Sequence, residues 1–472
     1  MSTATVVGSG PNGLACAVAL AQAGVEVTVL EAEATIGGGT RSAELTLPGV
    51  LHDVCSAGQP MAAASPFFRS LELEKHGLEW RWAEVDLAHP FDDGSAATMV
   101  RSIEQTAAGL GEDGPAWRQL FESPAAHFDE VNEDGLRPIL HLPRHPLRLA
   151  RFGIPAAAPA TVLARRWKSP ATRALFGGTS AHSFSPLTRP LSAAVGMALT
   201  AACHSVGWPV AGGGSQSIAD ALASVLREHG GRIETGVRVR SLAELGSPDV
   251  VAFDLAPTGV AEIVGDRLPS RVTRAYRRYK YGPAAFKVDL AVAGGVPWTA
   301  EACRRAGTVH LGGSLEEIVV AERDTNRGRM PARPFVLVCQ QYLADPGRSA
   351  GDVHPIWAYA HVPNGYDGDG EKAVLDQIER FAPGLRERII ATATHSPADF
   401  EAGNANYVGG DIVAGANTPL QFFFRPRFAL DPYSTGAPGL FICSAATPPG
   451  GGVHGMGGYN AAQSALRYLR QG

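Results

Sequence analysis

Short apolar runs alternate with helical stretches of small residues at the start of the chain. Residues 3–7 form a run rich in β-branched side chains, which is typical of a buried parallel strand. A glycine-rich turn follows, then a stretch over residues 14–23 that predicts a helix, and a second apolar strand over residues 25–30. This order of strand, turn, helix and strand predicts a βαβ unit, the building block of a parallel sheet.

The middle and the end of the chain repeat this alternation. A helix over residues 219–229 leads into a strand over residues 231–239, and a buried strand over residues 440–444 precedes a helix over residues 460–469. A longer strand is expected over residues 284–292, with apolar side chains facing one way and Lys287 and Asp289 facing the other. Together these elements predict an α/β protein.

Length and composition narrow the class further. The 472 residues are too many for one ordinary hydrophobic core, so we expect two domains. A share of 45% hydrophobic residues indicates a globular chain, and a net charge of -5 gives no indication of nucleic-acid binding. The six cysteines form no CxxC pair and the histidines lack metal-ligand spacing, which predicts buried free thiols and no metal site. Without a signal-peptide pattern or a run of ~18 apolar residues, we expect a cytoplasmic protein.

The turn after the first strand carries the first candidate chemistry. It reads GSGPNG over residues 8–13, the GxGxxG pattern. Gly8 permits a tight turn, Gly10 lets a pyrophosphate approach the backbone, and Gly13 allows the helix to pack closely on the strand. The helix N-terminus offers free N–H groups to phosphates, and Glu31 ends the second strand where it can accept hydrogen bonds from ribose hydroxyls. These features predict a dinucleotide site.

A second glycine cluster, over residues 37–39, follows Glu31 after six residues and favours FAD over NAD. An extended FAD runs on past the first turn and needs open backbone beside its ribityl chain, whereas an NAD site does not. No second GxGxxG follows a strand, so we expect electrons to leave to oxygen, a quinone or another diffusible acceptor.

With these motifs the sequence resembles the superfamily of FAD-dependent amine oxidases and phytoene desaturases, and it looks most like the desaturase-like branch. The family form places Gly-Gly-Arg after the acid, whereas this chain has Gly39 at the place of that Arg and Arg41 two places later. Two roles therefore stay open for Arg41, one facing the phosphates and one in a surface ion pair. The resemblance also implies that Val239 meets the adenine through its backbone.

The glycine-rich segment over residues 450–458 is the most specific match. The resemblance implies that it lies along the ribityl chain and the flavin, and that the following helix N-terminus stabilises the charge of the reduced ring. The residues expected to contact a non-covalent FAD are Gly8, Gly10, Pro11, Asn12, Gly13, Glu31, Ala32, Gly38, Gly39, Thr40, Arg41, Val239, Ala445, Gly452, Val453, His454, Gly455 and Met456.

The same resemblance implies discontinuous domains. We expect a Rossmann-type FAD-binding domain built from residues 1–65, 206–270 and 405–472. An inserted mixed α+β substrate domain is expected from residues 66–205 and 271–404.

Two residues are candidates for catalysis. Lys287 matches the Lys with which amine oxidases hold a water against flavin N5, although it could equally face water on an edge strand. His454, inside the last glycine cluster, could carry protons near neutral pH or cap the final helix. Neighbouring His52 and Asp53 are expected to point apart, and the aromatic residues 422–424 are candidates to line a substrate cavity or to pack in the core.

The function expected from these features is FAD-dependent dehydrogenation or desaturation of a small, mainly apolar or conjugated substrate, with hydride leaving a C–H bond that lies against flavin N5. Three alternatives remain: a flavin amine oxidase, a saturase or isomerase of conjugated double bonds, and a non-catalytic FAD-binding protein. The expected partners are the small substrate and the electron acceptor, and a peripheral contact with a membrane is left open.

Overall fold

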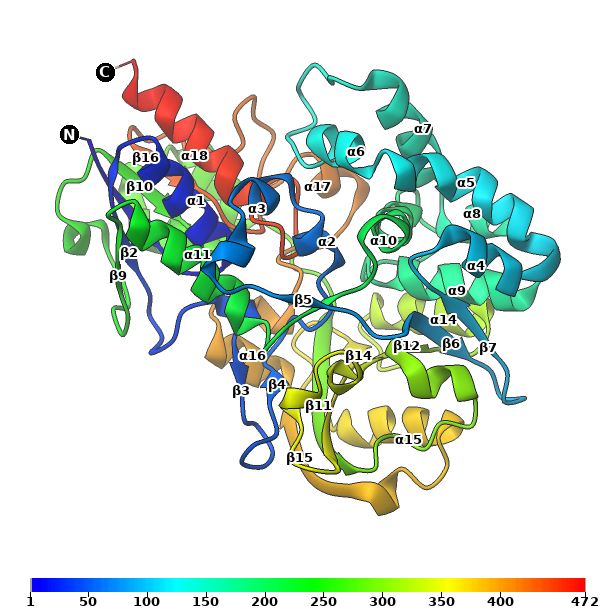
Figure 1. The fold of residues 1–472 in the computed structure, drawn as a ribbon. Coiled ribbons are helices and arrows are strands. Elements are labelled where there is room, and N and C mark those ends of the chain that lie inside the picture. Colours follow the sequence, from blue (N-terminus) through cyan, green and yellow to red (C-terminus); the bar gives the residue numbers. More distant parts are fainter. Residues whose placement is uncertain (1, 472) are drawn as a thin grey trace.

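The computed structural model describes residues 2–471, and two sheets organise it (Figure 1). The first is a five-stranded, fully parallel sheet in the order β16-β10-β1-β2-β9. Its strands are β1 (Thr3–Val7), β2 (Glu26–Leu30), β9 (Arg232–Glu234), β10 (Val250–Phe253) and β16 (Leu440–Ile442). The predicted α/β class with a Rossmann-type parallel sheet is thereby confirmed.

Helices cover both faces of this parallel sheet, as its buried strands require. One face carries α1 (Pro11–Gln22), α11 (Gln216–Glu228) and α18 (Met456–Leu469), whose apolar side chains pack with those of β1 and β2. The other face carries α12 (Pro257–Val264) and α13 (Ser270–Arg277).

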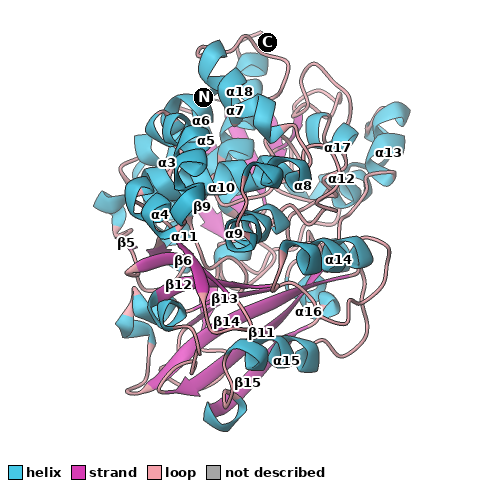
Figure 2. Cartoon of the chain, turned by 90° about the vertical axis from the view of Figure 1, so that its right-hand side faces the viewer, coloured by secondary structure: helices cyan, strands magenta, loops and turns pink. Residues whose placement is uncertain are grey.

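The second sheet is mixed and has seven strands in the order β15-β11-β14-β13-β12-β6-β7. Helices α9 (Pro170–Ala181) and α14 (Leu315–Thr325) cover one face and α15 (Glu371–Phe381) the other (Figure 2). The strands are β6 (Val85–Pro90), β7 (Ala96–Met99), β11 (Ala284–Ala293), β12 (Ala306–Leu311), β13 (Val336–Cys339), β14 (Val353–Val362) and β15 (Ile389–His395).

The remaining helices lie around both sheets, with α2 (Pro60–Ala63) and α3 (Pro66–Ser70) packing beside α1. The others are α4 (Ile103–Gly109), α5 (Gly114–Ala126), α6 (Phe128–Gly135), α7 (Pro146–Ala156), α8 (Ala160–Leu163), α10 (Ala193–Val206), α16 (Pro397–Gly403) and α17 (Pro419–Phe423). Two short strand pairs, β3 (Ser42–Ala43) with β4 (His52–Asp53) and β5 (Trp80–Arg81) with β8 (Val210–Ala211), complete the fold. None of the helices in residues 2–471 is both long and apolar enough to cross a membrane.

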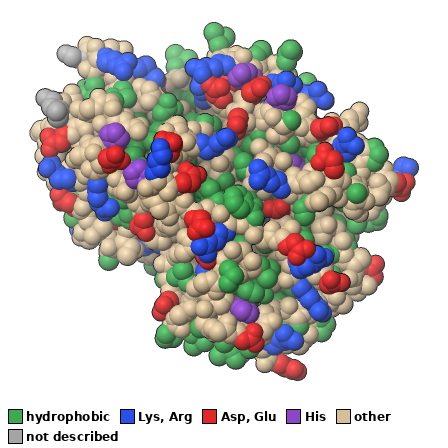
Figure 3. All heavy atoms as spheres, viewed as in Figure 1, with side chains coloured by type: hydrophobic (Ala, Val, Ile, Leu, Met, Phe, Trp, Pro, Cys, Tyr) green, Lys and Arg blue, Asp and Glu red, His purple; other side chains and the backbone are tan. Residues whose placement is uncertain are grey.

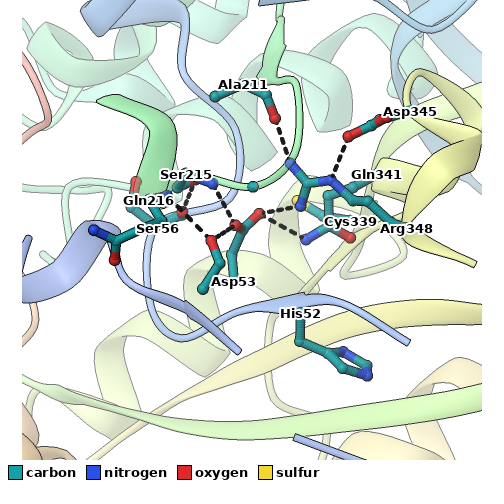
Figure 4. Close-up of polar contacts among 12 residues, drawn as sticks. His52, Asp53, Ser56, Ala211, Ser215, Gln216, Cys339, Gln341, Asp345 and Arg348 are labelled. Atoms are coloured by element: carbon teal, nitrogen blue, oxygen red, sulfur yellow. Dashed lines mark hydrogen bonds and ion pairs between the residues drawn. The ribbon is translucent and has the colours of Figure 1, made fainter. Parts of the chain in front are cut away.

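Each large sheet draws all its strands from one side of the predicted domain division, whose boundaries stay a prediction. A buried ion-pair network joins the two sides (Figure 4). Arg348 donates to Asp53 (2.7 Å), to Asp345 (3.1 Å) and to the carbonyl of Ala211 (2.6 Å). The neighbouring His52 points away from Asp53, as expected, and faces Asp289 at 3.3 Å.

Several element boundaries differ from the expected ones. The first helix begins at Pro11 rather than at residue 14, because proline fits the first helical turn, where its missing N–H costs nothing. The last helix begins at Met456 rather than at residue 460, so Gly457 and Gly458 are helical. Strand β9 ends at Glu234, and Val239 lies in the extended segment beyond it.

The six cysteines are all buried and free, which confirms the predicted thiols. On the face shown in Figure 3, charges of both signs are interspersed with apolar side chains.

Candidate functional site

A cavity of about 770 Å³ is lined by residues from both sides of the fold. We call the part lined by the N-terminal glycine turn and Glu31 its glycine end, and the part lined by the aromatic rings of the second sheet and helix α10 its aromatic end. Fifteen of the predicted FAD contacts line the cavity: Gly8, Gly10, Pro11, Asn12, Glu31, Ala32, Gly38, Gly39, Thr40, Arg41, Val239, Ala445, Gly452, Val453 and His454. Gly13, Gly455, Met456 and Lys287 do not line it.

The glycine turn at residues 8–13 is packed too tightly for side chains. A Cβ on Gly13 would lie 2.2 Å from the carbonyl oxygen of Gly8, which is the close helix–strand approach that the motif predicts. A Cβ on Gly10 would lie 2.6 Å from the carboxylate of Asp254. The space beside Gly10 is therefore shared with an acid that motif reasoning did not identify.

Asp254 follows strand β10 and is almost fully buried, at 7% exposure. Its carboxylate accepts a hydrogen bond from the N–H of Gly13 (2.9 Å), in the first turn of α1. Burial raises the pKa of Asp254 to about 7, and the nearby charge of Glu31 acts in the same direction. The residue thus switches between a neutral and a charged form near neutral pH, at the helix terminus that is predicted to bind phosphates.

Glu31 is held in place by three hydrogen bonds. Its carboxylate accepts from the N–H (2.9 Å) and the hydroxyl (2.5 Å) of Ser9 and from the N–H of Glu33 (2.9 Å). A carboxylate has about four acceptor sites, so capacity remains for a ribose hydroxyl. The position of this acid is fixed before any ligand binds.

The second glycine cluster departs from the family pattern for a visible reason. A Cβ on Gly39 would lie 2.1 Å from the hydroxyl oxygen of Tyr407, so this ring occupies the space that a larger residue would need. Arg41 donates to the carbonyls of Gly38 (2.9 Å) and Gly403 (2.7 Å) and lines the cavity. It makes no ion pair with any acid in residues 2–471, and its phosphate-facing role stays a prediction.

The glycine segment over residues 450–458 lines the cavity with its first part and packs against α1 with its last. Residues 450–452 line the cavity, whereas Gly458 lies where α18 crosses α1, with a virtual Cβ only 1.8 Å from the carbonyl oxygen of Asn12. His454 lines the cavity and accepts the N–H of Met456 through Nδ1 (3.1 Å), which is the helix-capping contact. Burial lowers the pKa of His454 to about 4, so the ring is neutral at pH 7.

Lys287 is fully buried on β11 and forms an ion pair with Asp289. Asp289 also faces His52 (3.3 Å) and His395 (3.7 Å). Burial raises the pKa of Asp289, but Lys287 and His52 outweigh this effect and the net shift is downward. Lys287 therefore pairs with a buried carboxylate and does not line the cavity. The catalytic role of Lys287 stays a prediction.

The aromatic end is apolar, with few polar groups. Its walls include Phe152, His182, Phe184, Ala194, Val195, Ala198, Leu199, Trp208, Leu337, Trp357, Tyr359 and Phe422. Of the residues 422–424, Phe422 lines the cavity.

A histidine pair at the aromatic end was missed from the sequence. His182, at the C-cap of α9, lies with Nε2 at 3.0 Å from Nε2 of His310 on β12. Nδ1 of His310 is buried without a partner against Gly178, and a buried unpaired acceptor is less costly than a buried unpaired N–H. We therefore assign the shared proton to His310 and an N–H at Nδ1 to His182. Burial lowers the pKa of His182 to about 3, so this ring is a neutral donor.

The residues at the glycine end fit an FAD. The cradle has no Cβ atoms at its turn, the N-terminus of α1 has no side-chain cap, and Glu31 keeps acceptor capacity. The continuous lining from Val239 to the aromatic walls gives room for a molecule longer than a mononucleotide.

Comparison with known proteins agrees with this geometry. Residues 6–66 match the family described as NAD(P)-binding Rossmann-like domain. The chain is 23% identical to pyridine nucleotide-disulfide oxidoreductase domain-containing protein 2 of Rattus norvegicus, over 99% of this chain and 94% of the relative. It is 28% identical to hydroxyneurosporene desaturase of Cereibacter sphaeroides, over 56% of this chain and 54% of the relative.

A solved structure of a putrescine oxidase variant shares the fold, with a TM-score of 0.63, 17% identity and coverage of 100% of this chain and 99% of that chain. The sequence relatives and the shared fold confirm the predicted resemblance and the oxidoreductase class. Members of this group bind FAD. By its relatives the chain is an oxidoreductase, and its sequence and fold are similar to those of the FAD-dependent amine oxidases and phytoene desaturases.

Proposed function

We propose that the protein binds one FAD non-covalently and dehydrogenates a mainly apolar organic substrate, passing the electrons to oxygen, a quinone or another diffusible acceptor. The observation that carries this proposal is a continuous cavity whose lining includes both a dinucleotide cradle and an apolar, aromatic chamber. Bound there, the flavin would accept the two electrons of the substrate.

The side chains of this protein bind and position rather than exchange protons. Glu31 would hold the ribose hydroxyls, and the N-terminus of α1 would face the phosphates. The N-terminus of α18 does not itself line the cavity, but His454, which accepts its first N–H, does, so the positive partial charge of this helix end would favour the reduced flavin from behind that wall. The aromatic walls offer an apolar surface to the substrate, and the neutral ring of His182 is available to donate one hydrogen bond to a polar group beside it.

The first experiment is an absorption spectrum of the purified protein, followed during anaerobic addition of candidate substrates. We expect a flavin band that acid denaturation releases into the supernatant and that bleaches with one class of apolar compound. A protein that stays colourless and gains no thermal stability from added FAD would overturn the proposal. A bound ring that no substrate reduces would instead support a non-catalytic FAD-binding protein.

Two matched variants test the cradle. Glu31→Gln should weaken FAD binding by about tenfold or more, because the charged acceptor of the ribose is lost. Glu26→Gln, whose carboxylate pairs with Arg232 at 2.6 Å on the surface and does not line the cavity, should leave FAD binding unchanged. Equal effects of the two changes would contradict the assignment of Glu31.

A further inference from the structure

Arg425 is a buried cation on the cavity wall that has no acidic partner. The residue is 2% exposed and lines the cavity just after α17. Its guanidinium donates through Nη2 to the amide oxygen of Asn417 (2.7 Å) and through Nε to the carbonyl of Gln421 (3.3 Å). Both acceptors are uncharged, and Arg425 forms no ion pair with any acid in residues 2–471.

Asp411 is the acid near enough to interact electrostatically with Arg425, but its carboxylate is hydrogen-bonded to other groups. Asp411 accepts three backbone N–H groups, from Gly282 (2.7 Å), Val413 (3.0 Å) and Gly415 (2.8 Å). This carboxylate organises its own loop and does not contact the guanidinium. The positive charge of Arg425 is therefore uncompensated at contact distance within the described chain.

An arginine side chain stays protonated in proteins, and a buried charge without a counter-ion is costly. Nη1 of Arg425 has no acceptor among the described residues. A Cβ on Gly450 would lie only 2.9 Å from Nη1, so the guanidinium packs closely against this glycine, which also lines the cavity. Nη1 and the second N–H of Nη2 together form a free fork of the kind that binds a carboxylate.

The position of Arg425 assigns this fork to the aromatic end. Asn417, which accepts from Arg425, donates to the carbonyl of Ser183 (2.9 Å). Ser183 stands between His182 and Phe184, and both of these line the aromatic end. Nucleotide phosphates are expected instead at the N-terminus of α1, and an oxidised flavin ring carries no charge.

We propose that Arg425 binds the carboxylate of the substrate, which is accordingly an amphiphile with an apolar body and one anionic head. This inference rests on the proposed function and narrows its substrate class. The apolar body lies along the aromatic walls, with the carboxylate in the free fork of Arg425 beside residue 450.

The test uses the flavin-loaded protein with decanoate and methyl decanoate as probes. Binding is measured through the tryptophan fluorescence of Trp208 and Trp357, which line the cavity, and through the shift of the flavin band. Decanoate should bind about ten- to a hundredfold more tightly than its methyl ester, the range of a charge-assisted hydrogen bond. Arg425→Gln should remove this preference without weakening the ester, and Arg425→Lys should retain part of it.

Arg427→Gln is the matched control on the same loop. Arg427 donates to the carbonyl of Ser434 (2.7 Å) and does not line the cavity, so its loss should not change the affinity for decanoate. Arg425→Gln should also melt at the same or a higher temperature than the parent, because an uncompensated buried charge is removed.

Equal binding of acid and ester, or a preference that survives Arg425→Gln, would overturn the carboxylate assignment. A change in the flavin spectrum of Arg425→Gln with an unchanged preference would show that Arg425 acts on the flavin instead. All three results leave the proposed function standing, since that function fails only when no flavin binds or none is reduced.

Discussion

Replacing Arg348 by methionine tests whether one buried network holds the two sides of the fold together. Arg348 is fully buried and contacts Asp53, Asp345 and the carbonyl of Ala211 (Figure 4). Asp53 belongs to the N-terminal segment, Ala211 precedes α11, and Asp345 lies beside the seven-stranded sheet. The guanidinium therefore joins three segments that are distant in sequence.

The expected cost follows from what the substitution leaves behind. Asp53 keeps its hydrogen bonds from Ser42 (2.8 Å) and from the N–H of Ser215 (2.7 Å), but no cation remains beside its carboxylate. Asp345 keeps Arg81 as a partner. Removing one partner of a buried pair costs about 3–5 kcal/mol, because the other charge stays buried. We expect Arg348→Met to lower the free energy of unfolding by about this amount.

Urea unfolding followed by far-UV circular dichroism measures the change. The matched control is Arg305→Met, since Arg305 pairs with Glu84 on the surface and both side chains are about half exposed. Such a pair is worth about 0–1 kcal/mol. The double variant Asp53→Asn with Arg348→Met should cost less than the sum of its single changes, because the second change removes a group that the first left unpaired. A loss no larger than that of the control, or strict additivity, would refute the reasoning.

Three further changes probe the site. Folding raises the pKa of Asp254 to about 7, so between pH about 4 and 7 the folded protein holds a proton that the unfolded chain has released. The free energy of unfolding therefore falls as the pH rises through this range. The urea midpoint of Asp254→Asn should accordingly depend less on pH there than the midpoint of the parent. Gly458→Ala should destabilise by about 2 kcal/mol or more, because its Cβ would overlap the carbonyl of Asn12, whereas Gly153→Ala, in open space on a helix, should be neutral or stabilising in the same melt. His182→Phe should slow the reduction of the flavin by substrate, but the pH dependence of this rate between pH about 5 and 8 should keep its shape. The reason is that a pKa of about 3 keeps the ring neutral over that range. Loss of an inflection over the same range in the variant would show that His182 titrates there.

The sequence predicts the dinucleotide cradle well because that site is built from neighbours. Strand, turn, helix and Glu31 follow one another within one βαβ unit, and each residue type answers a local need of backbone conformation or charge. Their positions in the structure agree with the motif, apart from the earlier start of α1.

Residues that act across long sequence separations escaped prediction. Asp254 meets Gly13 from 241 positions away, and His182 meets His310 from 128 positions away. No periodicity or spacing reports such pairs, because the fold alone brings them together.

The start of α18 was misplaced for a different reason. The intrinsic preference of glycine argues against a helix at Gly457 and Gly458. Close packing on α1 overrides that preference, since only glycine lets the two helices approach so far.

The charges at the two ends of the cavity lead to a prediction about the product. Two acids, Glu31 and Asp254, lie at the glycine end, whereas the cation Arg425 stands at the aromatic end. With FAD filling the glycine end, an anionic amphiphile would have only the aromatic end to enter and would be held there by its head. If Arg425 anchors the carboxylate, the carbon that faces the flavin lies at a fixed distance from the carboxylate, whatever the length of the tail.

In a series of saturated acids of increasing length, the new double bond should appear at a constant number of carbons from the carboxylate. Mass spectrometry of the products after ozonolysis measures that number. A position that stays constant from the methyl end would show that the tail, packed among the aromatic walls, sets the register instead.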